Sequence, residues 1–499
     1  MRKFFQFFSL TILTQGVLLL NQIVLLPIQI RIWGHASTAN WYATLALATS
    51  ATVADFGLRT AGHAALIRYA HNPGDERAET EFRHLWAWIK ILICVVTIPL
   101  IGLDLVYGGY RLWHTALIAG VALETLLCIR VMYLDSLELY REAEAGYLLL
   151  AAARLCLTVG ALVLFHSSPP TFGWIWFFTG VFAVAHQSRL CRRIGLLRLI
   201  EPIPAGLSWR TLAIARHTMA DPASTWMRNN VPVLILSAIA QPIAVTTYVA
   251  LRAVFGAARQ MILQLSRYAS VQYVSLRQSQ TEVAKVHFTL WMLLTAFFTS
   301  VLTCIVFADN FRVASFWLVR SDAALYQVMA LTFGLASPFY VYQFAQALML
   351  RYGEVSEIAR RQYLYIILLT IFAAISLLTK SVVFSLVVIL VADVTISFSF
   401  MLRSTGTPTS TGVHGSVAAL GSALLSGGLW LLVRACPLDF LHRSTTSAIV
   451  CTLGLLSLWT LVIAAVYLYI AHDLFPNART MAGSALRALF NSRSEEPAK

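Results

Sequence analysis

Uncharged apolar stretches of about 20 residues, the length of a membrane-spanning α-helix, recur along nearly the whole of this 499-residue chain. Only 12% of the residues are Asp, Glu, Lys or Arg, where soluble domains have about 25%. These two features exclude an ordinary soluble enzyme and leave little chain for a domain outside the bilayer. We therefore predict an all-α polytopic membrane protein.

The apolar windows predict the number of transmembrane helices. The pattern indicates about 14 of them, arranged as two sets of six followed by two more. The predicted spans are 5–30, 40–67, 86–107, 113–137, 145–166, 171–188, 212–240, 243–266, 286–308, 323–349, 362–379, 381–402, 413–433 and 447–471.

A basic segment after the sixth span indicates the domain organisation. Four arginines between 189 and 198 surround the apolar sequence 194–197, a pattern typical of an amphipathic segment at the membrane surface. The predicted domains are an N-terminal six-helix lobe at 1–188, a cytoplasmic basic linker at 189–211, a C-terminal six-helix lobe at 212–402, two additional transmembrane helices in 403–472 and a cytoplasmic tail at 473–499.

The net charge of +14 is distributed unevenly along the predicted topology. With the N-terminus in the cytoplasm, 22 of the 37 lysines and arginines fall on the cytoplasmic side, 7 on the opposite side and 8 inside spans. Such a bias is typical of inner-membrane proteins and predicts that both termini are cytoplasmic. Because the basic residues then face anionic lipid head groups, nucleic acid is not an expected partner.

Two segments of the chain repeat each other. Phe56-Gly57 precedes Arg68-Tyr69-Ala70 by twelve residues, and Phe255-Gly256 precedes Arg267-Tyr268-Ala269 by the same spacing. The match predicts that the second helix of each lobe is equivalent, as in transporters that are built from repeats.

Arginines inside the predicted spans are the first candidates for a binding site, because buried charges are costly and usually mark a pathway. Arg252 and Arg259 are seven residues apart and share a helix face, with no acid nearby in their own span. Arg154 lies in the middle of the fifth span. The alternative for Arg154 is an ion pair with Glu124 or Asp393 from another helix.

The second span carries charges of both signs. Asp55, Arg59 and His63 follow one another at intervals of four and are expected on one helix face. The structural alternative is an Asp55–Arg59 pair that neutralises both groups. Asp221, which precedes Pro222, is expected to cap a helix, with a role in ion coupling as the alternative. Aromatic residues near the span ends are expected to be interfacial anchors: Trp41, Tyr42, Trp113, Trp174, Trp176 and Tyr340.

Three acids in the spans, Asp55, Glu124 and Asp393, are candidates for carrying a coupling proton, with a structural counter-charge as the alternative for each. The spans hold eight basic residues against five acids, and an arginine-rich interior suits an anionic substrate. The sequence contains no phosphate-binding loop, no zinc-protease motif and no CxxC. We therefore expect no cofactor, no metal site and no enzymatic activity.

Two regions of the chain carry a recognisable pattern. They are the first ~70 residues, with Gln15-Gly16, Asn21, Pro27, Trp33-Gly34, Trp41-Tyr42 and Asp55-Phe56-Gly57-Leu58, and the stretch from Asn229-Asn230 to Tyr248. This pattern resembles the polysaccharide flippases, the O-antigen and exopolysaccharide branch of the multidrug/oligosaccharidyl-lipid/polysaccharide exporter superfamily.

The resemblance implies two six-helix lobes that form a V around a cavity open to either side in turn. It implies transport of undecaprenyl-diphosphate-linked oligosaccharide units across the bacterial inner membrane, for surface polysaccharide synthesis. Arg252, Arg259 and Arg154 would then hold the diphosphate and acidic sugars, with Arg59 assisting. The lipid-linked oligosaccharide and membrane lipids are the expected partners, and whether polymerase and chain-length proteins also bind stays open.

Two other functions remain as alternatives. The first is a cation-coupled drug or metabolite antiporter of the same superfamily, although such members commonly carry an acid in the first span and residues 4–30 here contain no charge. Lipid II flippases, another group of this superfamily, also fit less well, because they carry an arginine within the first span. Here Arg31 lies at the end of that span. The second is a membrane polymerase or ligase for sugar repeats, for which the outer loops are short.

Overall fold

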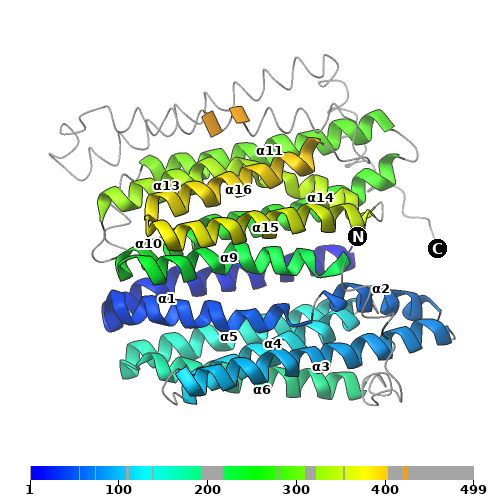
Figure 1. The fold of residues 1–499 in the computed structure, drawn as a ribbon. Coiled ribbons are helices and arrows are strands. Elements are labelled where there is room, and N and C mark those ends of the chain that lie inside the picture. The colour runs from blue at the N-terminus through cyan, green and yellow to red at the C-terminus, as the bar shows by residue number, and fades with distance from the viewer. Residues whose placement is uncertain are drawn as a thin grey trace. The chain divides into compact units, whose positions relative to one another are not determined.

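A computed structural model describes residues 2–193, 217–308 and 322–402, apart from short gaps at 56, 73–74, 108–111, 137–139, 278–280 and 352–353, together with 209, 318, 420–421 and 423–424. Every regular element in this part of the chain is a helix (Figure 1). The all-α class is therefore confirmed for the described residues. The predicted span at 447–471, the tail at 473–499 and nearly all of 413–433 lie outside them.

Apart from the stretches 194–219 and 309–322, at most four residues separate consecutive helices, as expected of a chain with little sequence outside a membrane. Their bounds are α1 (Arg2–Ala48), η1 (Thr49–Val53), α2 (Leu58–His71), α3 (Glu76–Tyr107), α4 (Leu112–Ser136), α5 (Tyr140–Phe165), α6 (Pro169–Arg193), α9 (Ala220–Ile239), α10 (Pro242–Arg277), α11 (Thr281–Ala308), α13 (Ala323–Ala336), η2 (Ser337–Val341), α14 (Tyr342–Arg351), α15 (Val355–Thr379) and α16 (Val382–Leu402).

Six helical stretches among the described residues are long and apolar enough to cross a membrane. The chain is therefore a multi-pass membrane protein, as predicted, while the total of about 14 spans stays a prediction. The six stretches are Gly16–Val53, Glu76–Gly102, Ala145–Phe165, Ala323–Leu350, Val355–Thr379 and Val382–Met401.

Helix α1 turns at Gly34. Its 47 residues would extend about 70 Å if they were straight, more than twice the thickness of the hydrocarbon core. Gly34 has φ 76° and ψ 170°, a non-helical conformation that separates two helical arms. Figure 1 shows these arms as the two dark-blue stretches that run beside each other. They correspond to the first predicted span and to the beginning of the second.

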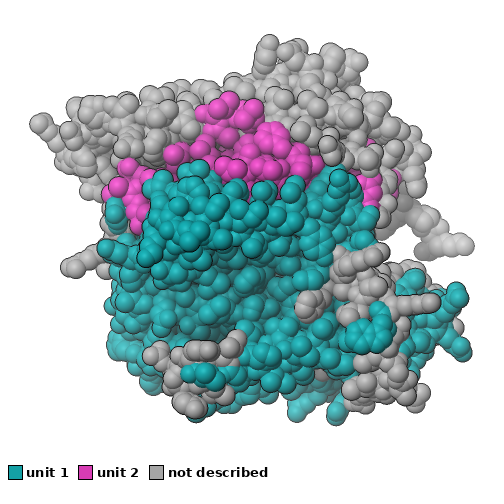
Figure 2. Space-filling view, viewed as in Figure 1, with its two compact units in different colours: residues 1–254, 315–322, 355–389 teal, residues 255–314, 323–354, 390–499 magenta. Residues whose placement is uncertain are grey.

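The chain divides into two compact units (Figure 2). The first comprises Met1–Val254, Ser315–Asp322 and Val355–Ile389. Its helix α1 packs against α5 and α9, and α9 packs against α15 (Figure 1). The second unit comprises Phe255–Ala314, Ala323–Glu354 and Leu390–Lys499. The lobe and linker boundaries predicted above stay predictions.

Aromatic residues form part of the core of the first unit. Trp41 and Trp113 stack with ring centroids 5.9 Å apart, and Phe172 meets Trp41 edge-on at 5.6 Å. All three side chains are buried. The expectation that Trp41 and Trp113 anchor the protein at the lipid interface is therefore wrong, because both rings are covered by neighbouring helices of the protein itself.

In the second unit, the predicted span 323–349 is not one continuous α-helix. Helix α13 ends at Ala336, the 3-10 segment η2 carries Pro338, and α14 begins at Tyr342. Proline lacks the N–H that an α-helix requires in its interior, which explains a change of helix type here. The buried rings of Tyr273, Phe288 and Phe344 pack in the core of this unit.

Candidate functional site

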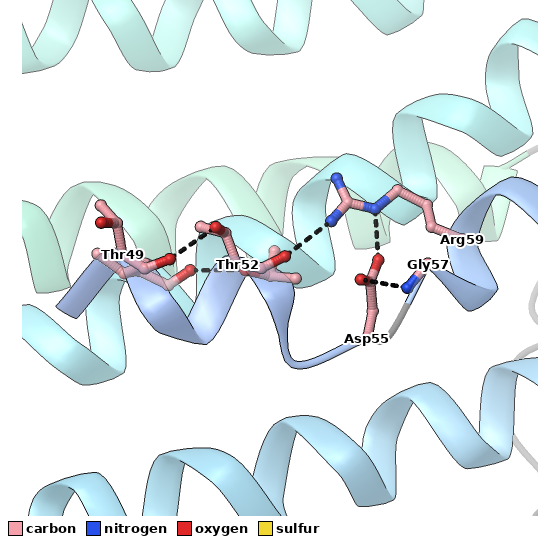
Figure 3. A network of polar contacts seen from close by, with 7 residues as sticks. Thr49, Thr52, Asp55, Gly57 and Arg59 are labelled. Carbon is pink, nitrogen blue, oxygen red and sulfur yellow. Dashed lines mark hydrogen bonds and ion pairs between the residues drawn. The ribbon is translucent and has the colours of Figure 1, made fainter. Parts of the chain in front are cut away.

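The second predicted span is broken rather than continuous. The backbone passes from η1 through Asp55 to Gly57, which has φ 70°, and only then enters α2 (Figure 3). Glycine adopts a positive φ without the steric cost that a Cβ atom causes. Asp55 therefore lies in the break, and no continuous helix face carries Asp55, Arg59 and His63, contrary to the prediction.

The carboxylate of Asp55 holds this break together (Figure 3). It is almost completely buried and accepts a hydrogen bond from the Gly57 N–H at 3.1 Å. Arg59 donates through Nε to the other carboxylate oxygen at 2.7 Å and through Nη2 to the Thr52 carbonyl at 3.2 Å. The structure thus has the internal pair that the sequence allowed as the structural alternative for Asp55 and Arg59.

Replacement of Asp55 by asparagine is expected to destabilise the fold by about 1–3 kcal/mol, because the isosteric amide lacks the charge that compensates Arg59. The measurement is reversible detergent denaturation of the purified protein. A double-mutant cycle with Arg59→Gln isolates the pair, and additive losses would show that the two side chains do not interact.

Gly57 also marks a close backbone contact with the segment before α9. A Cβ atom added at Gly57 would lie 2.1 Å from the carbonyl oxygen of Thr218 and 2.6 Å from the backbone nitrogen of Met219. Residues from the two sequence halves therefore meet here, within the first unit.

Arg154 on α5 is surrounded by side chains of α4 and α6. Its Nη1 donates to the carboxylate of Glu124 at 2.8 Å, and its Nε donates to the hydroxyl of Thr179 at 3.1 Å. The guanidinium lies over the ring of Trp176, with its carbon 3.9 Å from the ring centroid. Of the two partners proposed from the sequence, Glu124 is the one with which Arg154 forms an ion pair.

Close packing of α4 against α6 sets the geometry around Arg154. A Cβ atom added at Gly120, one turn before Glu124, would lie 2.8 Å from the backbone carbon of Trp176. Small residues allow helices to approach this closely inside membranes. Glu124 and Trp176 are therefore held on two tightly packed helices, which favours a rigid site.

Arg252 on α10 lies among polar groups of α1 and α9. Its Nη1 donates to the backbone carbonyl of Asn229, and the phenol groups of Tyr42 and Tyr248 are close enough to interact with it electrostatically. Tyr42 itself donates to the side-chain carbonyl of Gln29 at 3.1 Å. Among the residues that the structure describes, no carboxylate pairs with Arg252.

A second contact joins the same helices near Arg252. The Nδ1 atom of His35 on α1 lies 2.9 Å from the hydroxyl of Thr246 on α10, and the two residues are 211 positions apart in the chain. Arg252 is thus placed where elements from the two sequence halves pack together within the first unit.

Arg228 on α9 is a buried arginine that the sequence did not single out. Its Nε donates to the hydroxyl of Tyr365 on α15 at 3.0 Å, and its guanidinium carbon lies 4.5 Å from the centre of the Tyr365 ring. The sequence signal for Arg228 was its position in the interior of the seventh predicted span, 212–240. Its partner, 137 residues away, could not be recognised from spacing.

Asp221 does not cap α9. The helix begins at Ala220, so Asp221 lies in its first turn. Its side chain accepts a hydrogen bond from the Gln362 amide at 3.2 Å instead. The expectation of an N-terminal cap at Asp221 is wrong, because the residue at the cap position is Met219 and Asp221 already lies inside the helix.

The remaining candidates belong to the second unit. Arg259 on α10 is partly buried and makes no ion pair with a described residue. Asp393 on α16 is buried, and its backbone carbonyl accepts the hydroxyl of Ser397 at 2.6 Å. Their roles in substrate binding and proton coupling stay predictions.

Comparison with known proteins rests on structure alone. No family model and no curated protein matches the sequence. The solved structure of the lipid II flippase MurJ in an inward closed conformation is similar, with a TM-score of 0.61 and 11% sequence identity over 95% of this chain and 99% of that one.

Two further solved structures are similar at lower scores. One is an inward-facing multidrug-resistance transporter of the MATE family, in the MOP superfamily, with a TM-score of 0.49 and 12% identity over 85% of this chain and 99% of that one. The other is a MOP-superfamily transporter from Pyrococcus furiosus, with a TM-score of 0.42 and 12% identity over 84% and 97%. The similarity to the MurJ structure shows that this chain has the fold seen in the lipid II flippase MurJ.

Proposed function

We propose that this protein moves polyprenyl-diphosphate-linked oligosaccharide units across the bacterial inner membrane by alternating access. The observation that carries the proposal is Arg252, an arginine of α10 that lies in the predicted span 243–266 and has no carboxylate partner among the described residues. A cation in this position needs compensation, and an anionic substrate supplies it. The fold, which is similar to that of a flippase for a lipid-linked substrate, agrees with this function.

The chemistry of arginine favours a phosphate-containing substrate. A guanidinium binds two oxygens of a phosphate or carboxylate at once, and it stays protonated inside a membrane. The Nη1 atom of Arg252 is held by the Asn229 carbonyl, which orients the group while leaving other N–H donors for a ligand. We assign the diphosphate to Arg252, with Arg259 and Arg154 binding further anionic groups and Arg59 assisting.

The lipid and sugar portions of the substrate would follow different routes. The polyprenyl tail stays in the bilayer, because its transfer into a polar interior would cost apolar contacts with lipid. The diphosphate and sugars cross through the protein interior. Glu124, Asp55 or Asp393 would carry a proton where the cycle is coupled to one.

Deletion of the gene is expected to cause accumulation of one completed repeat unit on the polyprenyl carrier at the cytoplasmic face. The reason is that assembly of the unit precedes its transport. Mass spectrometry of the lipid-linked sugars, combined with accessibility of the sugar to an added periplasmic glycosidase, measures both quantity and side.

Two other results would contradict this function. Units that accumulate unjoined at the periplasmic face would indicate a polymerase or ligase. Unchanged lipid-linked sugars, together with new sensitivity to cationic drugs, would indicate an antiporter.

A further inference from the structure

The surroundings of Arg154 have the form of an anion-binding site that a protein carboxylate already fills. Arg154 is buried, and its guanidinium is contacted by α4 through Glu124 and by α6 through Thr179 and Trp176. The Trp176 ring, against the face of the guanidinium, and the Thr179 hydroxyl, at Nε, fix the plane of the group. Its Nη1 and Nη2 atoms then form the edge to which an oxyanion binds through two oxygens.

The carboxylate of Glu124 uses this edge incompletely. It contacts Nη1 through one oxygen at 2.8 Å, whereas Nη2 is buried and has no hydrogen-bond partner within the described part of the chain. A buried N–H of a charged group without an acceptor is unfavourable. An oxyanion that contacted both nitrogens would be a better ligand than Glu124 is.

The difference in exposure between the two partners shows which one can leave. The Glu124 side chain is 28% exposed, against 6% for Arg154. Glu124 therefore lies on the open side of the pair, and a ligand that approaches Arg154 from that side meets the carboxylate first.

We propose that Glu124 is an internal stand-in for an oxyanion, and that Arg154 exchanges it for a phosphate or carboxylate group of the substrate. The exchange keeps a negative charge beside Arg154 in both the empty and the loaded protein, so that the buried cation is never uncompensated. Return of Glu124 to Arg154 then promotes release of the ligand. Only the identity of the transported ligand depends on the proposed flippase function.

The test measures anion binding to the purified full-length protein in lipid nanodiscs by titration calorimetry. The probes are inorganic pyrophosphate and glucuronate, which represent a diphosphate and an acidic sugar. Glu124→Gln removes the competing charge but keeps the shape, so its affinity for at least one probe is expected to rise tenfold or more. In the Glu124→Gln background, Arg154→Gln removes this gain, and Arg154→Lys, which keeps the charge without the fork, reduces it.

Glu357→Gln is the matched control, because Glu357 also pairs with a buried arginine. Arg361 and Glu357 are 3.2 Å apart, with 6% and 36% of their side chains exposed, but both belong to α15. This variant has the same change of charge and is expected to bind neither probe more tightly. An equal gain in both glutamine variants, or no gain in Glu124→Gln, would overturn the proposal.

The two probes assign the ligand. A gain for pyrophosphate alone places the diphosphate of a lipid carrier at Arg154, and a gain for glucuronate alone places an acidic sugar there. Failure of this exchange is distinguishable from failure of the proposed function. If Glu124→Gln gains anion affinity but cells that lack the gene accumulate no lipid-linked sugar, the flippase function is rejected and the anion site is retained. If the sugar accumulates but Glu124→Gln gains no affinity, only the anion site is rejected.

Discussion

Arg252→Ala is expected to abolish translocation while leaving the abundance of the protein in the membrane unchanged. Cells that carry this variant should accumulate the lipid-linked unit to the level of the deletion, a loss of transport of at least about a hundredfold. The physical reason is that hydrogen bonds to a charged group contribute about 1.5–3 kcal/mol each, and a diphosphate makes more than one with an arginine. The removed bond to the Asn229 carbonyl is expected to affect stability much less.

The controls separate charge from geometry. Arg252→Lys keeps the charge and loses the fork, so it should retain partial transport. Arg360→Ala on α15 removes an arginine that is 76% exposed and forms only a 3.8 Å pair with Glu357; transport should be normal. If Arg252→Ala supports normal transport, Arg252 does not bind the substrate.

Gly57→Ala is expected to have the largest effect on the folded structure. Alanine is strained at φ 70°, and its Cβ would overlap the Thr218 carbonyl, which is backbone and cannot rotate away. Together these effects predict a destabilisation of about 2–5 kcal/mol. The measurement is the midpoint for loss of monodisperse protein on heating in detergent, with a clear decrease expected.

Gly256→Ala is a matched control for this change, because Gly57 and Gly256 occupy equivalent positions of the sequence repeat. Gly256 lies inside the continuous helix α10 and has no atom within 4 Å of an added Cβ. Alanine there should leave the stability unchanged or raise it by up to about 1 kcal/mol. Equal midpoints for the two variants would show that Gly57 does not contact Thr218 in the folded protein.

The repeat also shows where sequence reasoning stops. The same Phe-Gly spacing occurs in both halves, yet one copy surrounds a break in the backbone and the other lies in an unbroken helix. Local sequence does not distinguish them. The difference at Gly57 is the neighbouring backbone of Thr218 and Met219, which comes from a distant part of the chain.

Charge pairing shows the same limit. The sequence placed Arg154 in the middle of a span and allowed Glu124 as its partner, but it equally allowed Asp393. The packing of α4, α5 and α6 places Glu124 in an ion pair with Arg154. It also brings the ring of Trp176 and the hydroxyl of Thr179 into contact with the guanidinium. Residues on different helices have no fixed spacing in sequence, so periodicity cannot select between them.

The sequence by itself determined that this chain is helical and spans a membrane many times. Those properties follow from the length and apolarity of local stretches, because each backbone group in lipid must bond within its own helix. Only the tertiary structure decided which buried charges are compensated. Arg154 has Glu124 and Arg59 has Asp55, whereas Arg252 has a hydrogen bond to a backbone carbonyl and no carboxylate among the described residues. Such compensation depends on a few ångströms between helices, and helix packing alone sets that distance.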